Sequence, residues 1–212
     1  STEWVPPGVT VDGTRVLTSR EALVSKVLPG RIVIVGAGAV GLEFAYVYSM
    51  YGAKVTVIEM ADQALPGADK EVAQVVEREF RRNKIEIRTG TRFEELKVEA
   101  GGVRVTVRKG DKSEVLEADQ VLMAIGRRPL SADLGLEAAG VATDAKGFVT
   151  VDERFATSVA TVRAIGDLAG APLLAHKASE EGVAAVELLA GIERPALDHR
   201  KIPACIYCQP QV

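Results

Sequence analysis

Gly36, Gly38 and Gly41 have the spacing Gly-x-Gly-x-x-Gly and directly follow an apolar run that is typical of a buried strand. In a strand–turn–helix unit, the first glycine makes the tight turn, the second lets a pyrophosphate approach the backbone, and the third lets the helix pack on the sheet. The phosphates would lie on free N–H groups at the positive end of the helix. These glycines, with Ala39 and Val40 between them, predict a dinucleotide-binding turn; a glycine-rich turn in another α/β sheet is the alternative.

A second strand, Val55–Ile58, follows the expected helix and ends at Glu59. A carboxylate at this position can accept hydrogen bonds from both hydroxyls of an adenosine ribose, and it would repel a 2′-phosphate. Glu59 therefore favours NAD over NADP.

Composition excludes several classes of function. The chain has 212 residues, 47% of them hydrophobic, and a net charge of −3 without a basic block, so it gives no sign of nucleic-acid binding. No apolar run approaches the ~20 residues needed to span a bilayer, and residues 1–20 lack the features of a signal peptide, so a cytoplasmic location is the default expectation. His176, His199, Cys205 and Cys208 are too few and too far apart to predict a metal site.

The predicted fold class is α/β, with a Rossmann-like parallel sheet. After the first strand–helix–strand unit, Asp69 is a predicted cap of a second helix, and residues 85–88 form the next strand. Alternating apolar and polar residues over 103–108, with glycine-containing turns on either side, predict an antiparallel meander where a crossover helix is expected. The continuous apolar run 121–125 predicts a further buried parallel strand.

Residues 147–190 read as a different unit. Phe148–Val151 and Thr161–Ile165 predict two strands, and residues 172–190 predict a loop followed by a helix. The predicted apolar face of that helix comprises Ala175, Ala178, Val183, Val186 and Leu189.

These motifs together resemble the flavoprotein disulfide reductases, most closely the dihydrolipoamide dehydrogenases, from one end of the chain to the other. The Ile-Gly-Arg-Arg-Pro and Leu-Ala-His-Lys-Ala segments are much more specific than the glycine motif alone. The matching segments are Gly36–Glu43, Glu59, Ile125–Pro129, Ala164–Asp167, Leu174–Gly182 and Ile206–Val212.

The resemblance implies an FAD domain that is interrupted by an NAD domain and followed by a dimerisation domain. Residues 1–30 and 129–200 would be parts of the FAD-binding domain, and residues 31–128 the NAD-binding Rossmann domain. Residues 201–212 would begin the dimerisation domain.

The same resemblance implies a flavin site in the second unit. Asp167 would bind the ribityl hydroxyls of FAD, with a turn or helix cap as its alternative role. Leu173, Leu174, Ala175 and His176 would lie along the flavin, where a helix beginning near Ala175 would direct its N–H groups at the N1–C2 carbonyl edge. His176 is expected to be a positioning residue rather than an acid–base catalyst.

Three further residues are candidates for NAD binding by resemblance. Glu43 would face the nicotinamide end of NAD, and its other expected role, stabilising the helix dipole, is compatible with this one. Phe93 and Gly126 would line the NAD groove, although ordinary core and turn roles remain open for them.

No catalytic residue is predicted in this chain, because the redox Cys-x-x-x-x-Cys pair and the His–Glu base of the family are absent from it. The chain is therefore expected to be the central portion of a longer, homodimeric enzyme and inactive alone. That enzyme would oxidise dihydrolipoamide on the lipoyl-bearing subunit of 2-oxo acid dehydrogenase complexes and pass hydride through FAD to NAD. A non-catalytic NAD-binding fragment, or part of another reductase such as mercuric reductase, is the alternative.

Cys205 and Cys208 form a Cys-x-x-Cys sequence, but the residues around them predict a strand. Residues i and i+3 of a strand point to opposite faces, so we do not expect this pair to replace the missing redox cysteines.

Overall fold

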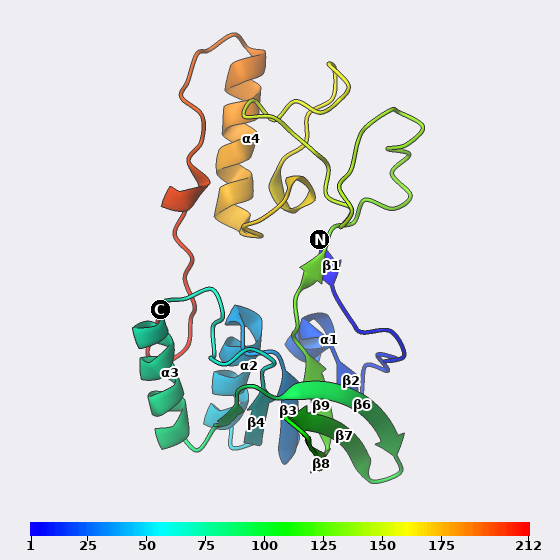
Figure 1. Ribbon diagram of the computed structural model, residues 1–212, viewed down its shortest axis with the longest axis vertical. Coiled ribbons are helices and arrows are strands. Elements are labelled where there is room, and N and C mark those ends of the chain that lie inside the picture. Colours follow the sequence, from blue (N-terminus) through cyan, green and yellow to red (C-terminus); the bar gives the residue numbers. More distant parts are fainter. The chain divides into compact units, whose positions relative to one another are not determined.

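The computed structural model describes residues 1–212, which divide into two compact units. The larger unit comprises residues 3–126 and 205–212, and the smaller unit comprises residues 1–2 and 127–204. The glycine turn and Glu59 belong to the larger unit, whereas Asp167 and the helix that follows it belong to the smaller one (Figure 1).

A five-stranded parallel sheet with strand order β2-β9-β3-β4-β5 forms the centre of the larger unit. The sequence order reverses at β3, and open α/β sheets bind ligands at the carboxyl ends of strands beside such a reversal. The strands of this sheet and the helices between them are β2 (Val16–Leu17), α1 (Ser19–Val24), β3 (Arg31–Val35), α2 (Ala39–Met50), β4 (Lys54–Ile58), α3 (Lys70–Arg82), β5 (Glu86–Arg88) and β9 (Gln120–Met123).

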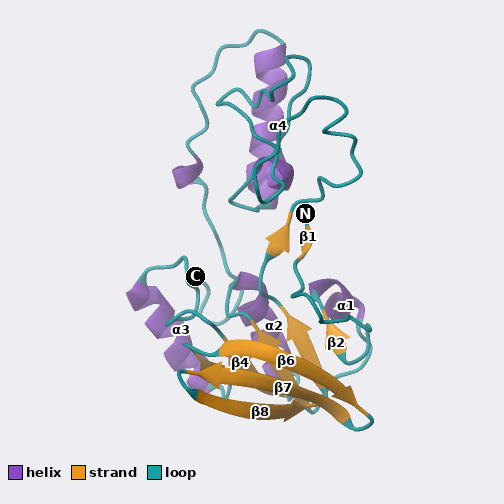
Figure 2. Cartoon of the chain, turned by 45° about the vertical axis from the view of Figure 1, so that its right-hand side comes forward, coloured by secondary structure: helices purple, strands orange, loops and turns teal.

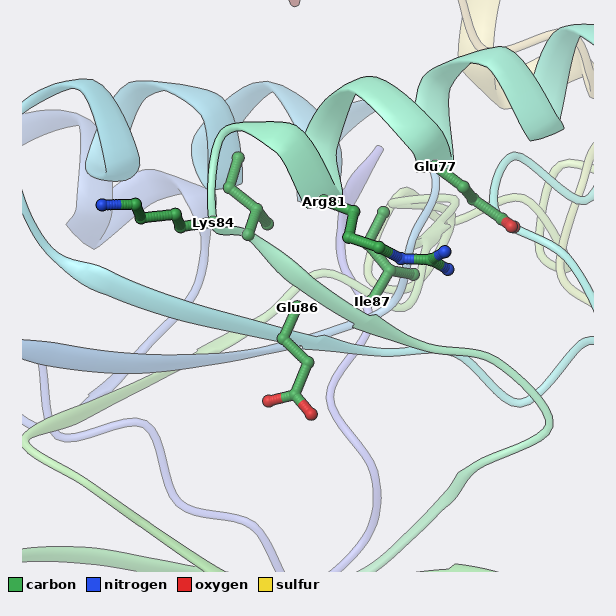
Figure 3. Close-up of a pocket in the computed structure, with 6 residues that line it drawn as sticks. Glu77, Arg81, Lys84, Glu86 and Ile87 are labelled. Carbon is green, nitrogen blue, oxygen red and sulfur yellow. The ribbon is translucent and has the colours of Figure 1, made fainter.

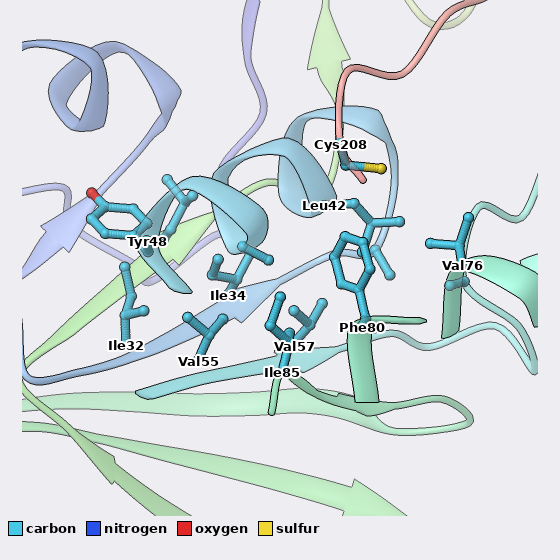
Figure 4. Close-up of a cluster of buried hydrophobic side chains, with 14 of the residues drawn as sticks. Ile32, Ile34, Leu42, Tyr48, Val55, Val57, Val76, Phe80, Ile85 and Cys208 are labelled. Atoms are coloured by element: carbon cyan, nitrogen blue, oxygen red, sulfur yellow. The ribbon is translucent and has the colours of Figure 1, made fainter. Parts of the chain in front are cut away.

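Both faces of the parallel sheet are covered. In β3, Ile32 and Ile34 belong to the apolar cluster shared with α2 and α3, whereas Val33 and Val35 belong to a cluster on the opposite face. Figure 4 shows Ile32 and Ile34 among the side chains of the first cluster. Burial on both faces explains why this strand is a continuous apolar run rather than an alternating one.

The opposite face carries the antiparallel meander, which comprises β6 (Arg92–Glu99), β7 (Gly102–Lys109) and β8 (Lys112–Ala118) (Figure 1). Alternate side chains of β7, Val103 and Val105 among them, pack against the parallel sheet. The predicted fold class and the predicted meander are confirmed. Asp69 caps α3 as predicted, since its side chain accepts a hydrogen bond from the N–H of Glu71 (2.8 Å).

The smaller unit contains one long helix, and most of its remaining residues form loops (Figure 2). The two strands predicted at Phe148–Val151 and Thr161–Ile165 are wrong, because these segments form only the isolated bridges Thr143–Val149 and Ala156–Arg163. A separate two-stranded sheet pairs β1 with β10. The bounds of these elements are β1 (Thr2–Glu3), β10 (Arg127–Arg128), the 3-10 helices η1 (Gly166–Ala169) and η2 (His199–Lys201), and α4 (Ala175–Leu189).

The helix predicted within 172–190 is confirmed as α4, but its predicted apolar face is wrong. Val186 is 66% exposed, and Val183 and Leu189 are exposed as well. The side chains that α4 buries are instead Lys177, Glu181, Ala184 and Ala185. Two ionisable side chains are therefore inside the unit while three large apolar ones lie at its surface.

Residues 205–212 pack on the larger unit without forming a strand, so the strand expected around Cys205–Cys208 is wrong. Cys208 is buried in the apolar cluster that contains Leu42 and Phe80 (Figure 4). Residues 3–30 also group with the larger unit, since β2 extends its sheet by pairing with β9. The two compact units thus have other bounds than the predicted domains, and the domain assignment itself stays a prediction.

Candidate functional site

The glycine turn connects β3 to the N-terminus of α2. Gly38 is the N-cap residue, and the N–H of Leu42 makes the first helical bond, to the carbonyl oxygen of Gly38 (3.0 Å). The N–H groups of Ala39, Val40 and Gly41 precede that bond and have no partner within the helix. No side chain caps this end, and no acidic residue lies in its first turn. It therefore offers N–H donors and a positive dipole to an external anion.

Gly36 and Gly41 are required by the packing of the chain itself. Gly36 has φ +107°, and a Cβ there would lie 2.4 Å from the carbonyl oxygen of Ala124. A Cβ on Gly41 would lie 1.9 Å from the carbonyl oxygen of Gly36. A side chain at Gly36 would push the turn away from the residues that follow β9, and one at Gly41 would push α2 away from the turn.

Gly38 differs from the other two glycines. Its φ of −79° is available to any residue, and a Cβ built on it meets no atom of the protein within 4 Å. The fold therefore does not need glycine at this position. The open space beside its backbone fits a pyrophosphate, which must approach the N–H groups closely.

The Glu59 carboxylate lies beside the same turn. Its Oε2 accepts a hydrogen bond from the N–H of Ala37, and its Oε1 accepts one from the N–H of Ala61, both at 2.8 Å. A carboxylate has about four acceptor positions, so these two bonds fix its orientation and leave capacity for ribose hydroxyls.

The sheet brings the predicted nucleotide residues to one edge. Val35 pairs with Ile58 of β4 and with Met123 of β9, so the glycine turn, Glu59 and the residues that follow β9 leave the sheet side by side. Gly126, with φ +133°, has open space around its Cβ position, and its carbonyl oxygen accepts a hydrogen bond from the N–H of Trp4 (2.9 Å).

Glu43 and Phe93 have additional contacts within the larger unit. Glu43 Oε1 accepts a hydrogen bond from the backbone N–H of Tyr207 (2.8 Å), so the 205–212 segment lies against α2 at this residue. Phe93 is half-buried and packs on the cluster between the parallel sheet and the meander, next to an irregularity in the β6–β7 register.

The smaller unit holds the second group of predicted residues. Asp167 lies in η1, and its carboxylate accepts a hydrogen bond from the Ser1 hydroxyl. The Ser1 oxygen in turn accepts a hydrogen bond from Arg127 Nε (2.7 Å). The half-buried Asp167 is therefore part of a polar cluster rather than a cap of α4.

The N-terminus of α4 resembles that of α2 in its chemistry. Leu174 is the N-cap residue, and this end has neither a side-chain cap nor an acid in its first turn. Leu173 and Leu174 are half-buried, whereas Ala175 and His176 are exposed. His176 Nε2 lies 2.7 Å from the carbonyl oxygen of Pro203. An apolar pair beside free N–H groups fits the flat, partly polar edge of a flavin.

Comparison with known proteins decides the family. Residues 4–182 match the family described as pyridine nucleotide-disulphide oxidoreductase. The chain belongs to this family. Its members are oxidoreductases that use FAD and NAD.

The similar proteins are longer than this chain. A dihydrolipoyl dehydrogenase of Mycobacterium leprae is 42% identical over 207 residues, which are 97% of this chain and 44% of that protein. A mitochondrial dihydrolipoyl dehydrogenase of Pisum sativum is 38% identical over 97% of the chain and 41% of its own length. The chain thus spans about half the length of the curated relatives that it matches.

Solved structures of the family have the same fold. LpdA of Mycobacterium tuberculosis has a TM-score of 0.92 at 30% identity, covering 99% of this chain and 45% of that one. The HOCl-induced flavoprotein disulfide reductase RclA of Escherichia coli has a TM-score of 0.86 at 29% identity, covering 99% and 48%. The resemblance inferred from the sequence motifs is confirmed. None of the helices in this member of the family is long and apolar enough to cross a membrane.

Sequence reasoning missed a buried polar network in this oxidoreductase. Lys177, Glu181 and His199 form hydrogen bonds around the backbone of Gly166, whereas the sequence identifies the first two only as parts of a matching motif. The signal available in the sequence is the i, i+4 spacing of Lys177 and Glu181, which places them on the face of α4 that also carries Ala184 and Ala185.

The larger unit has a surface cavity of about 340 Å³ (Figure 3). None of the residues predicted to bind NAD or FAD lines it. Its charged lining balances two acids against two bases, so it has no net charge that would attract phosphate. The cavity is lined by Glu77, Arg81, Lys84, Ile85, Glu86 and Ile87.

The two cysteines differ in environment, and neither forms a disulfide. Cys205 is exposed, whereas Cys208 is buried and its thiol donates a hydrogen bond to the carbonyl oxygen of Pro210 (3.2 Å). Burial, aided by the negative charge of Glu43, raises the pKa of the Cys208 thiol. A raised pKa disfavours the thiolate that disulfide exchange requires.

Proposed function

We propose that this chain is the NAD-binding and partial FAD-binding portion of a dihydrolipoamide dehydrogenase. The enzyme would oxidise protein-bound dihydrolipoamide through a disulfide and FAD, with hydride transfer to NAD. The observation that carries the proposal is the environment of Gly38, because the protein's own atoms leave open space at its Cβ position, beside the N–H groups at the start of α2. Its support is the likeness to relatives named dihydrolipoyl dehydrogenase.

The proposed NAD site lies at the carboxyl edge of the parallel sheet. The N–H groups at the start of α2 hold the pyrophosphate, Glu59 accepts hydrogen bonds from the adenosine ribose, and Glu43 faces the nicotinamide end. Phe93 and Gly126 line the groove. Because Glu59 is already oriented by two backbone N–H groups, it binds the ribose without first having to be ordered.

The proposed FAD site uses the smaller unit. Asp167 binds the ribityl hydroxyls, and residues 173–176 lie along the flavin, with the N–H groups at the start of α4 facing its N1–C2 edge. A bound flavin supplies the electron transfer between a dithiol and NAD. The dipole of α4 stabilises the negative charge that gathers at that edge on reduction.

The domain assignment and partners are part of the same proposal. Residues 31–128 are assigned to the NAD-binding domain, 1–30 and 129–200 to the FAD-binding domain, and 201–212 to the start of the dimerisation domain. The parent enzyme is proposed to be a cytoplasmic homodimer that acts on the lipoyl-bearing subunit of 2-oxo acid dehydrogenase complexes. The relative in Pisum sativum is named mitochondrial, so a mitochondrial location is the alternative to the cytoplasmic one.

Two alternatives each have one supporting observation. RclA, a disulfide reductase of a different name, is nearly as similar in structure as LpdA, and its similarity supports another flavoprotein disulfide reductase as the parent. Mercuric reductase belongs to the same alternative. The burial of Cys208 supports a role for the isolated chain as a non-catalytic NAD-binding fragment.

Calorimetric titration of the purified chain with NADH and NADPH tests the NAD site, and addition of FAD with a visible absorption spectrum tests the flavin site. We expect NADH to bind more tightly than NADPH. Glu59→Gln should weaken NADH binding about tenfold, because an amide presents an NH₂ group to one of the two backbone N–H donors and loses the charge. Glu117→Gln, an exposed acid on the meander, is the matched control.

Tighter binding of NADPH, or an unchanged NADH affinity in Glu59→Gln, would contradict the NAD assignment. A protein that retains no flavin band after FAD addition and gel filtration would contradict the FAD half-site in this chain. Turnover of dihydrolipoamide by the purified chain would contradict its proposed inactivity.

A further inference from the structure

Lys177 and Glu181 form an ion pair inside the smaller unit. The two residues are one turn apart on α4, their side chains are 1% and 2% exposed, and Lys177 Nζ lies 3.1 Å from Glu181 Oε1. Burying two charges is costly unless each finds further hydrogen-bond partners. The identity of those partners therefore indicates what the pair does.

The partners are the backbone groups of η1, the short helix that carries Asp167. Lys177 Nζ donates hydrogen bonds to the carbonyl oxygens of Gly166 (3.0 Å) and Gly170 (2.8 Å), at the start and just past the end of η1. Glu181 Oε2 accepts a hydrogen bond from the N–H of Gly166 (2.6 Å). With the ion pair itself, all three ammonium donors of Lys177 are used.

The packing around this network holds η1 directly against α4. Gly166 has φ +68°, and a Cβ there would lie only 3.1 Å from the Cβ of Ala178. His199 Nε2 lies 2.7 Å from Glu181 Oε1 and is the only member of the network with substantial exposure. An apolar pair of the same volume would fill the space but could not bind the three backbone groups of η1.

We propose that Lys177 and Glu181 are positioning residues, which fix η1 to α4 and thereby set the place of the Asp167 carboxylate relative to the N-terminus of α4. The Asp167 carboxylate and the N-terminus of α4 are both assigned to the flavin under the proposed function, and the identity of the ligand rests on that proposal. Neither Lys177 nor Glu181 reaches the surface, so neither touches the flavin. The fastening of η1 to α4 does not depend on what is bound.

The test uses Lys177→Met and Glu181→Gln in the purified chain, with Glu180→Gln as the control. Glu180 is the adjacent residue on α4, but it is exposed and its carboxylate bonds only to Arg194. Two quantities are measured: the hydrogen-exchange rate of the Gly166 amide by NMR, and the affinity for FAD by flavin fluorescence. NADH affinity and the exchange protection of Ala184 and Ala185 report whether each variant is folded.

We expect both variants to raise the exchange rate of the Gly166 amide about tenfold or more, because its bond to a charged acceptor is lost or no longer oriented. FAD binding should weaken by a similar factor, while NADH affinity stays unchanged because the NAD residues belong to the other unit. The control should change neither quantity. A merely stabilising ion pair would lower the melting temperature without a selective effect at Gly166 and on FAD.

Either of two results would overturn the proposal: an unchanged Gly166 exchange rate in both folded variants, or an unchanged FAD affinity despite faster exchange. If the unmodified chain binds no FAD, the proposed flavin site fails instead, and the exchange rate of Gly166 alone decides whether the pair fastens η1. Should a single variant fail to fold, the double variant Lys177→Met/Glu181→Leu removes both buried charges and restores the comparison.

Discussion

Replacing Gly38 by alanine separates what the fold needs from what the ligand needs. Gly38 is the N-cap residue of α2, its φ of −79° suits alanine, and the new methyl group would meet nothing within 4 Å. Alanine is a somewhat poorer N-cap than glycine, by roughly 0.5 kcal/mol. It also reduces the conformational freedom of the unfolded chain, which stabilises by about 0.4–1 kcal/mol. The two terms oppose each other, so the free energy of unfolding should change little.

The effect on a bound dinucleotide should be much larger. The methyl group would occupy the space through which the pyrophosphate reaches the N–H groups of the turn. Losing one hydrogen bond between an N–H group and a charged oxygen costs about 1.5–3 kcal/mol. Since 1.4 kcal/mol is a factor of ten, the Kd for NADH should rise about 10- to 100-fold in Gly38→Ala.

Calorimetric titration with NADH and a thermal melt of each variant provide the two readouts. Gly101→Ala is the matched control, because Gly101 also has open space around its Cβ position and lies outside the left-handed region. It is in the turn between β6 and β7, away from the carboxyl edge of the parallel sheet. An unchanged Kd in a fully folded Gly38→Ala protein would refute the assignment of the turn to the pyrophosphate, and equal losses in both variants would point to a general effect of removing glycine.

Two further predictions concern pH and thiol chemistry. Burial raises the pKa of Asp12, but hydrogen bonds from the N–H of Val16 and two neighbouring N–H groups outweigh it and leave the pKa lowered. Asp12→Asn should therefore destabilise the protein above the ordinary pKa of aspartate, with the difference disappearing as pH falls through the folded-state pKa; urea unfolding across a pH series measures this, and a constant difference would contradict it. Cys205 should react with a thiol reagent at neutral pH well before Cys208, whose pKa burial raises. Mass spectrometry of labelled peptides checks the order, and equal rates would count against it.

The larger unit could be predicted from local patterns because its decisive signals are local. The strand before Gly36 is buried on both faces, and its uninterrupted apolar run shows this directly. Gly36 and Gly41 are fixed by contacts within the strand–turn–helix unit and with the neighbouring strand. The alternating apolar and polar residues of β7 indicate a strand with one buried face. The glycine spacing and the apolar pattern can be recognised within these short segments, although the contact that excludes a Cβ at Gly36 comes from Ala124 in a distant segment.

The smaller unit could not be predicted in the same way, because its backbone groups find partners in loops. The N–H of Val149 bonds to the carbonyl oxygen of Leu168, and the N–H of Ala164 bonds to that of Phe155. The apolar runs around these residues have the composition of strands, but only single bridges form. A high β-propensity means that the side chains suit a buried sheet surface. It does not provide the neighbouring strand whose backbone would complete the hydrogen-bond ladder.

The two acids that bind backbone groups from distant segments show where sequence reasoning stops. Glu43 is predicted to face a nicotinamide, and its contact with the N–H of Tyr207 joins residues 164 positions apart. Glu181 accepts a hydrogen bond from the N–H of Gly166, which is closer in sequence. A charged residue on a helix is nevertheless predicted to be exposed, because its buried hydrogen-bond partner cannot be identified from the sequence. Motif spacing assigns residues to ligands, whereas the residues that hold the motifs in place are visible only once distant backbone groups are brought together. The buried pair on α4 is such a case, and its chemistry is explained by the η1 backbone rather than by α4 itself.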